Sequence, residues 1–181
     1  GCTMPASRSQ TGTTVTSNCW INAPGQSSNQ GCGVTNTQPT SYGDNLNNAG
    51  GGVYATLWNS NGISIWWFQR SAIPSDITSG SPNPSGWPTP DANFPFGSSC
   101  PSSFFANHQI VVDLTFCGDW AGNVYSQFSC PGTCQDYVQN NPSAFSDAYW
   151  GINKFQVWQP AGSSTTNKKT KSKKNKAPKT N

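Results

Sequence analysis

The fold class of this chain can be predicted from residues 53–70, which read VYATLWNSNGISIWWFQR. Apolar and polar side chains alternate before the central turn, and a period of two is typical of a β-strand. Val53, Ala55 and Leu57 share one face of the first predicted strand, and Tyr54, Thr56 and Trp58 share the other. The turn contains Asn61-Gly62, a strong hairpin signal because both residue types tolerate positive φ. The stretch therefore predicts an antiparallel hairpin.

The second strand of this hairpin carries large aromatic side chains on both faces. Trp67 points one way and Trp66 and Phe68 point the other, so the strand is expected either between two sheets or between a core and a ligand. Trp66, Trp67 and the neighbouring Trp58 are expected in the core.

The composition favours an all-β protein. Only 9% of the 181 residues are charged, against about 25% in ordinary soluble domains, and Gly and Pro are abundant. Few helix formers and many turn formers predict short strands joined by long loops. The length suits one domain, since single domains mostly run to about 100–200 residues.

A second strand signal occupies residues 110–116 and leads into a glycine-flanked turn, so that residues 110–122 read IVVDLTFCGDWAG. Ile110, Val112, Leu114 and Phe116 share one face of the predicted strand. Asp113 and Thr115 lie on the other face, where they would line a groove in a concave sheet or be ordinary outer residues in a solvated one.

Trp120 lies in the glycine-flanked turn. An indole with few neighbours in a turn can stack on the face of a sugar ring, and its alternative role is to cap the edge of the core. The turn also carries Asp119. The pattern suits sugar binding.

The remaining segments predict surface loops, one helix and one further strand. Seven prolines within residues 71–103 predict a surface excursion attached at Cys100. Thr133 is a plausible N-cap for a short helix, with Asp136 three residues on and Pro142 as its stop. Alternation over residues 151–159 predicts a closing strand.

The composition changes at residue 161, so we expect a domain over residues 1–160 and a lysine-rich tail over residues 161–181. The tail carries seven of the ten basic residues and no apolar residue but Ala, so it is expected to be disordered. Lysines attract anionic polymers or surfaces. The tail has no interleaved aromatic residues for base stacking, and we expect no nucleic-acid partner and favour a solvated extension.

Seven cysteines without a Cys-x-x-Cys pair predict disulfides formed in an oxidising compartment. Their pairing cannot be read from the sequence, and an odd number leaves one thiol free or without its partner. We therefore expect a secreted or extracellular, cell-wall protein. No apolar run approaches the ~20 residues of a membrane span. The chain begins Gly-Cys-Thr without a leader, which is expected of a processed or partial product.

The acidic residues argue against catalysis within this chain, which has seven Asp and no Glu. A retaining glycosidase needs two carboxyl groups about 5–5.5 Å apart. Asp113 and Asp119 come closest to a suitable spacing, but a Cys-Gly turn separates them. His108 is the only histidine and no Gly-x-Ser-x-Gly elbow accompanies it. We expect no catalytic residue, no metal site and no cofactor.

The chain resembles the fungal laminarinase-type endo-β-1,3(4)-glucanases of glycoside hydrolase family 16. The resemblance runs in unbroken order over residues 1–159. Its segments are Cys2-Thr3-Met4-Pro5-Ala6-Ser7, Gly31-Cys32-Gly33, Ser41-Tyr42-Gly43, Gly50-Gly51-Gly52-Val53-Tyr54-Ala55, Trp67-Phe68-Gln69-Arg70, residues 114–122, Cys130-Pro131-Gly132-Thr133-Cys134, Asp136-Tyr137-Val138, Asn141-Pro142-Ser143-Ala144-Phe145 and Ala148-Tyr149-Trp150.

The resemblance implies a concanavalin-like β-jelly-roll sandwich, incomplete at its N-terminus, and β-glucan as the ligand. It implies substrate contacts from Trp120, Asp113, Thr115 and Asp119; at Asp113 the family commonly has Asn, which would add a donor. The family's catalytic motif, Glu-x-Asp-x-x-Glu, lies upstream of the matching region, and a chain without Glu cannot contain it.

Three functional hypotheses follow. The first is the C-terminal portion of a secreted β-glucanase, inactive by itself, whose partners would be β-glucan polysaccharide or oligosaccharide and a missing N-terminal segment of the same domain. The second is a non-catalytic glucan-binding or wall-associated protein. The third is a gene fragment with no function of its own.

Overall fold

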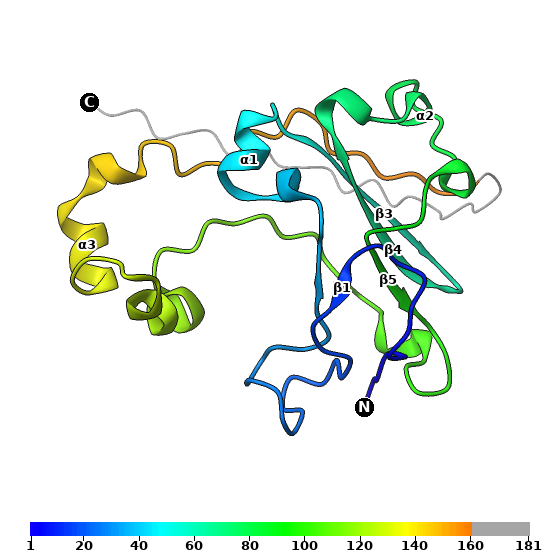
Figure 1. The fold of residues 1–181 in the computed structure, drawn as a ribbon, viewed down its shortest axis with the longest axis horizontal. Coiled ribbons are helices and arrows are strands. Elements are labelled where there is room, and N and C mark those ends of the chain that lie inside the picture. Colours follow the sequence, from blue (N-terminus) through cyan, green and yellow to red (C-terminus); the bar gives the residue numbers. More distant parts are fainter. Residues whose placement is uncertain (161–181) are drawn as a thin grey trace, which may run out of the picture. The chain divides into compact units, whose positions relative to one another are not determined.

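A computed structural model describes residues 1–160, so the predicted tail lies outside the described residues. The chain divides into two compact units, Gly1–Ile110 and a second that begins at Val111. The strands of the first unit are β1 (Thr13–Thr14), β2 (Val34–Thr35), β3 (Gly52–Asn59), β4 (Gly62–Gln69) and β5 (Ala92–Pro95). The first unit also contains helices α1 (Gly43–Asn48) and α2 (Ser75–Thr78), and the second contains α3 (Cys134–Asn140) (Figure 1).

The predicted hairpin is confirmed as the longest strand pair among the described residues. β3 and β4 pair antiparallel along their whole length, from Gly52 opposite Gln69 to Asn59 opposite Gly62 (Figure 1). The predicted alternation along β3 is also confirmed. Val53, Ala55 and Leu57 are partly buried, whereas the side chains that alternate with them, Tyr54, Thr56 and Trp58, are exposed.

The turn of the hairpin lies at residues 59–62, as predicted. Ser60 and Asn61 form the loop, while Gly62 opens β4. The Asn59 side chain stabilises this turn by accepting a hydrogen bond from Asn61 N at 2.8 Å. Gly62 is required for a different reason: it has φ +148°, and a Cβ there would run into the backbone of Phe94 and Pro95.

β4 is the central strand of a three-stranded sheet, order β3-β4-β5, and both of its faces are buried. On one face, Trp66 and Phe68 pack against the edge of Trp87, with ring centroids 5.1 and 5.3 Å away. On the other face, Tyr54 covers Trp67 at 4.6 Å. Large aromatic side chains therefore cover both faces of β4, and the predicted burial of Trp66 and Trp67 is confirmed.

The prediction that Trp58 belongs to the core was wrong. Its side chain is 47% exposed, and its ring meets the His108 ring edge-on with the centroids 5.4 Å apart. Trp58 is exposed because it lies on the solvent face of β3, whereas Val53, Ala55 and Leu57 form the partly buried face.

The carboxylate of Asp91 continues the sheet where β5 can no longer pair with β4. The last pair of that ladder is Ile65 with Ala92. Pro90 has no N–H to donate to Trp67 O, and its carbonyl accepts the Thr11 N–H at 2.9 Å. Asp91 Oδ2 therefore serves as the acceptor of the Trp67 N–H, at 2.6 Å. Its Oδ1 accepts hydrogen bonds from Gln38 Nε2 at 2.9 Å and from Thr11 Oγ1 at 3.0 Å. Asp91 is buried, so it joins three segments of the first unit through the interior.

A second small core forms around disulfides. Cys2 pairs with Cys100 and Cys19 with Cys32, and Met4 is buried against the first pair. The predicted attachment at Cys100 is thus confirmed. The proline-rich segment contains the short helix α2, several turns and the edge strand β5, and it supplies no central strand, as its composition predicted.

Two predicted strands, residues 110–116 and 151–159, are wrong for the structure described here. Both segments are irregular, and Val111, Phe155 and Val157 are at least 60% exposed. A strand needs a neighbouring strand to take its backbone hydrogen bonds, and neither segment belongs to a sheet among residues 1–160. Alternating side chains indicate a preference for extended backbone, but they do not show whether another strand is present to pair with it.

The predicted helix is confirmed as α3. Thr133 Oγ1 accepts the N–H of Asp136 at 3.2 Å and donates to its carboxylate at 2.7 Å. The helix ends at Asn140, two residues before Pro142. Among residues 1–160, no helix is long and apolar enough to cross a membrane.

Removing the Asp91 carboxylate should destabilise the first unit strongly. Asp91→Ala leaves the buried Trp67 N–H, the Gln38 amide and the Thr11 hydroxyl without their acceptor, at an expected cost of about 3 kcal/mol. Urea unfolding followed by tryptophan fluorescence measures the change. The control is Asp147→Ala, an exposed carboxylate. A loss below about 0.5 kcal/mol for Asp91→Ala would contradict the role assigned to it.

Candidate functional site

The turn that carries Trp120 is a single π-helical turn, Gly118–Gly122, in the second unit. We call it the Trp120 turn. Its closing hydrogen bond runs from Gly122 N to Cys117 O at 3.2 Å. Cys117 and Gly118 enter it with φ of +63° and +70°, so the chain reverses over two residues in the left-handed region. Gly118 adopts this conformation readily, whereas Cys117 does so only if its surroundings hold it there.

A disulfide between Cys117 and Cys134 supplies that restraint. It joins the start of the Trp120 turn to the first residue of α3, and both cysteines are buried. Cys130 is the one free cysteine of the seven and is partly exposed. The odd thiol expected from the sequence is therefore Cys130.

The Trp120 turn presents its indole to solvent. Trp120 is 73% exposed, and it does not cap a core in the structure described. Asn123 reinforces the turn twice, through its N–H to Trp120 O and through its amide Nδ2 to Asp119 O at 2.6 Å. The Asp119 carboxylate makes no hydrogen bond within residues 1–160, so it can accept bonds from a ligand. An exposed indole beside a free acceptor suits a ligand with one apolar face and hydroxyl groups at its edge.

Asp113 and Thr115 lie on the irregular segment before this turn rather than on a concave sheet. Thr115 is held near the Trp120 turn: its Cγ2 is 3.3 Å from the position that a Cβ on Gly118 would occupy. Asp113 is fixed by its backbone, whose carbonyl accepts the Trp150 indole N–H at 2.8 Å. Both side chains are exposed.

The apolar face predicted for this segment is retained in part. Phe116 packs edge-on against Phe145 at 5.0 Å, and Phe145 also meets Tyr137 of α3 at 5.9 Å. These contacts anchor one end of the segment to α3. Asp113 and Thr115 stay predicted ligand contacts.

Most of the other acids are engaged in structural hydrogen bonds. The Asp76 carboxylate accepts hydrogen bonds from Asn83 N, from the Trp87 indole and from its neighbour Ile77 N. These donors, the Asn83 N–H above all, lower the pKa of Asp76. Asp91 and Asp136 serve the sheet and the α3 cap. Among residues 1–160, no group of three or more His, Cys, Asp or Glu could hold a metal ion.

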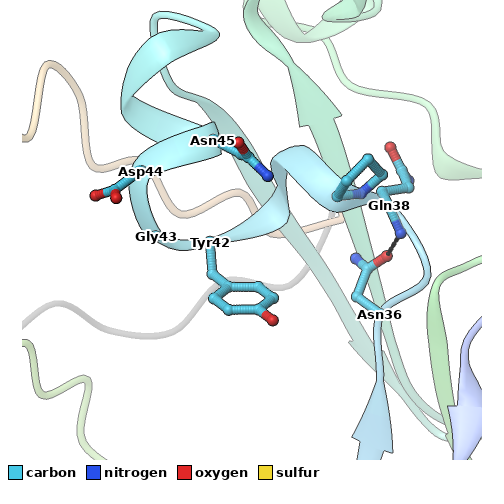
Figure 2. Close-up of a pocket in the computed structure, with 7 residues that line it drawn as sticks. Asn36, Gln38, Tyr42, Gly43, Asp44 and Asn45 are labelled. Carbon is cyan, nitrogen blue, oxygen red and sulfur yellow. Dashed lines mark hydrogen bonds between the residues drawn. The ribbon is translucent and has the colours of Figure 1, made fainter.

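An open pocket of about 400 Å³ in the first unit was not predicted from the sequence. Figure 2 shows it between the start of α1 and the loop before it. It is lined by Asn36, Gln38, Pro39, Tyr42, Gly43, Asp44 and Asn45. The sequence feature that could have indicated this pocket is the series of Asn and Gln residues on either side of Tyr42.

A family model for the catalytic domain of glycoside hydrolase family 16, of the XgeA-like type, matches residues 1–158. The chain belongs to glycoside hydrolase family 16. The match covers both compact units, the Trp120 turn and the pocket, and it confirms the resemblance on which the sequence-based prediction relied.

Curated relatives of this family come from fungi. The chain is 51% identical over 161 residues to a probable glycosidase of Schizosaccharomyces pombe, covering 88% of this chain and 38% of that protein. It is 45% identical over 166 residues to an endo-1,3(4)-beta-glucanase of Arthroderma benhamiae, covering 88% of this chain and 36% of that one. The chain thus spans well under half the length of these relatives.

Solved structures of family 16 laminarinases share the fold. A mutant laminarinase 16A that cyclises laminariheptaose aligns with a TM-score of 0.74 at 46% identity, over 82% of this chain and 51% of that one. Laminarinase 16A from Phanerochaete chrysosporium, solved with β-glucans in its donor and acceptor sites, aligns with a TM-score of 0.70 at 43% identity. The predicted fold class, an all-β jelly roll, is confirmed by these alignments, and the chain spans about half the length of each structure.

The disulfide Cys117–Cys134 should govern the order of the Trp120 turn and α3. The double variant Cys117→Ser/Cys134→Ser opens a loop whose closure contributes about 3 kcal/mol. Amide hydrogen exchange should show α3 protection falling by about 100-fold. The matched control is Cys130→Ser, which removes a free thiol and should leave α3 protection unchanged. Equal protection in the double variant and the control would contradict this role.

Proposed function

We propose that this chain forms part of a secreted endo-β-1,3(4)-glucanase and supplies glucan contacts rather than the catalytic carboxylates. One observation carries the proposal: a strained π-helical turn, braced by a disulfide, presents Trp120 with 73% of its surface exposed. An exposed indole held in a constrained turn offers a flat apolar surface on which one face of a sugar ring can stack.

The relatives support a β-glucan as that ligand. The Arthroderma protein is named an endo-1,3(4)-beta-glucanase, and the Phanerochaete laminarinase holds β-glucans in its donor and acceptor sites. Identities of 45% and 43% to these two proteins make the same polysaccharide class the first choice here.

The proposed binding mode stacks the apolar C–H face of a glucosyl ring on the Trp120 indole. The carboxylates of Asp119 and Asp113 and the hydroxyl of Thr115 then accept or exchange hydrogen bonds with the ring hydroxyls. Burial of one pyranose face on an aromatic ring supplies affinity, and the directional hydrogen bonds supply orientation. The ligand carries no charge, so we expect little dependence of binding on salt.

Hydrolysis by a retaining mechanism requires a nucleophilic carboxylate and a second carboxyl that acts as acid and then base, about 5–5.5 Å apart. The 181 residues contain no Glu, and Asp76, Asp91 and Asp136 are engaged in structural hydrogen bonds. We assign no catalytic residue in this chain.

An extracellular or cell-wall location fits the cysteine chemistry. Three disulfides and one free thiol are arranged among seven cysteines, and such bridges persist in oxidising compartments. The glucan of a fungal cell wall lies outside the cell, where disulfides also persist.

Trp120→Ala should weaken binding of laminari-oligosaccharides by about tenfold or more, because it removes the aromatic anchor of the proposed site. Isothermal titration with laminaritetraose measures the effect. The control is Trp20→Ala, which removes another half-exposed tryptophan, in the first unit. Equal affinities for wild type and Trp120→Ala would contradict the assignment.

The purified 181-residue chain should release no reducing ends from laminarin above the uncatalysed background, because it lacks a carboxyl pair for the retaining mechanism. A reducing-sugar assay over a day at several protein concentrations provides the measurement. Turnover proportional to protein concentration would show that Asp side chains of this chain perform the chemistry.

A further inference from the structure

We infer that the pocket around Tyr42 is a second glucosyl-binding subsite, formed within the first unit and independent of the Trp120 turn. We call it the Tyr42 pocket. The choice of a glucosyl ligand rests on the proposed function, whereas the pocket's preference for a neutral, hydroxyl-rich ring follows from its own residues.

The backbone holds the Tyr42 ring out of the core. Ser41, at the end of a 3-10 turn, is buried, and Tyr42 follows with extended angles of φ −159° and ψ 172°. Gly43 then takes φ +65° and turns the chain into α1. A Cβ at Gly43 would meet no neighbour, so glycine is needed there for its conformation alone. The result is a tyrosine that is 73% exposed between two short helical turns.

Asn36 has a fixed amide orientation opposite this ring. Its Oδ1 accepts the backbone N–H of Gln38 at 2.8 Å, and only the amide oxygen can do so. Its Nδ2 is therefore turned the other way, and Figure 2 shows this nitrogen on the side of Tyr42. Nδ2 has no hydrogen-bond partner within residues 1–160, so two N–H donors are available to a ligand.

Gln38 gives the pocket a rigid wall. Its Nε2 donates to the buried Asp91 carboxylate at 2.9 Å and lies 3.4 Å from Trp67 O. The wall is thus tied to the central strand β4. A pre-organised wall matters for weak ligands such as sugars, because no side-chain freedom is lost there on binding.

Asn45 supplies a further polar group from α1. Figure 2 shows its amide directed toward the Gln38 side of the pocket, whereas the Asp44 carboxylate lies on the opposite side of the helix start. We therefore assign ligand contact to Asn45 and not to Asp44.

The residue types select the ligand class. The lining contains three amides, one exposed phenol ring, one proline and one carboxylate, but no Lys, Arg or His. An anion finds no cation here, and a purely apolar ligand would displace water from the Asn36 and Asn45 amides without replacing its hydrogen bonds. A pyranose has one C–H face for Tyr42 and hydroxyls for these two amides. The volume of about 400 Å³ lies within the range of small-molecule sites.

The test is a laminaritriose titration of the ¹⁵N-labelled 181-residue chain followed by NMR. The backbone amides of Tyr42, Gly43 and Asn45 report on the Tyr42 pocket, and the indole N–H of Trp120 reports on the Trp120 turn. Three variants accompany the wild type. Tyr42→Ala removes the ring, Asn36→Asp keeps the acceptor for Gln38 N but removes the free donor, and Tyr149→Ala removes a similarly exposed tyrosine of the second unit.

The wild type should show saturable shifts at both reporters. Tyr42→Ala should weaken binding at the Tyr42 pocket by about tenfold, and Asn36→Asp should weaken it by about threefold. Neither variant should change the affinity measured at the Trp120 indole N–H. Tyr149→Ala should change neither curve.

The outcomes separate the two proposals. Shifts at Trp120 with none at the Tyr42 pocket, or pocket affinity unchanged in Tyr42→Ala, would overturn the subsite and leave the proposed function standing. Shifts at the pocket with none at Trp120 would overturn the assignment of the Trp120 turn and support the subsite. The absence of shifts at both reporters would overturn both.

Discussion

The carboxylate of Asp91 is the interaction on which the order of the first unit depends. β4 carries the aromatic core on both faces, but β5 covers its edge only as far as the pair of Ile65 with Ala92. Beyond that point Pro90 offers no N–H, and the backbone of Trp67 would be left buried without partners. The Asp91 carboxylate and the Gln38 amide take the places of strand groups there. The wall of the Tyr42 pocket is built from the same Gln38, so the sheet and the pocket share one network.

The two units hold their shape by different means. The first combines a three-stranded sheet, two disulfides and the Asp91 network. The second has one disulfide, the capped helix α3 and a small group of aromatic contacts around Phe145. Because so little apolar surface is buried in the second unit, a covalent bridge beside the Trp120 turn has a proportionally larger effect on the order of its residues.

Local patterns were sufficient where a feature depends on neighbouring residues. The hairpin follows from alternation around residues 59–62, and α3 follows from Thr133, Asp136 and Pro142. The exposure of Trp120 follows from its flanking glycines. The strands expected at residues 110–116 and 151–159 failed because alternation carries no information about a pairing partner. Asp91 could not be found from sequence, since its partners lie 24, 53 and 80 residues away. The Tyr42 pocket was missed because its amides look like ordinary loop composition.

The central claim is that this family 16 chain carries glucan-binding surface on the Trp120 turn without its own hydrolytic carboxylates. Hydrogen–deuterium exchange of the 181-residue chain, measured by mass spectrometry with and without laminarin, tests this most directly. Slower exchange in peptides that cover residues 117–123, with unchanged exchange in β5, is the predicted result. Unchanged exchange over residues 117–123 at saturating laminarin would contradict the account.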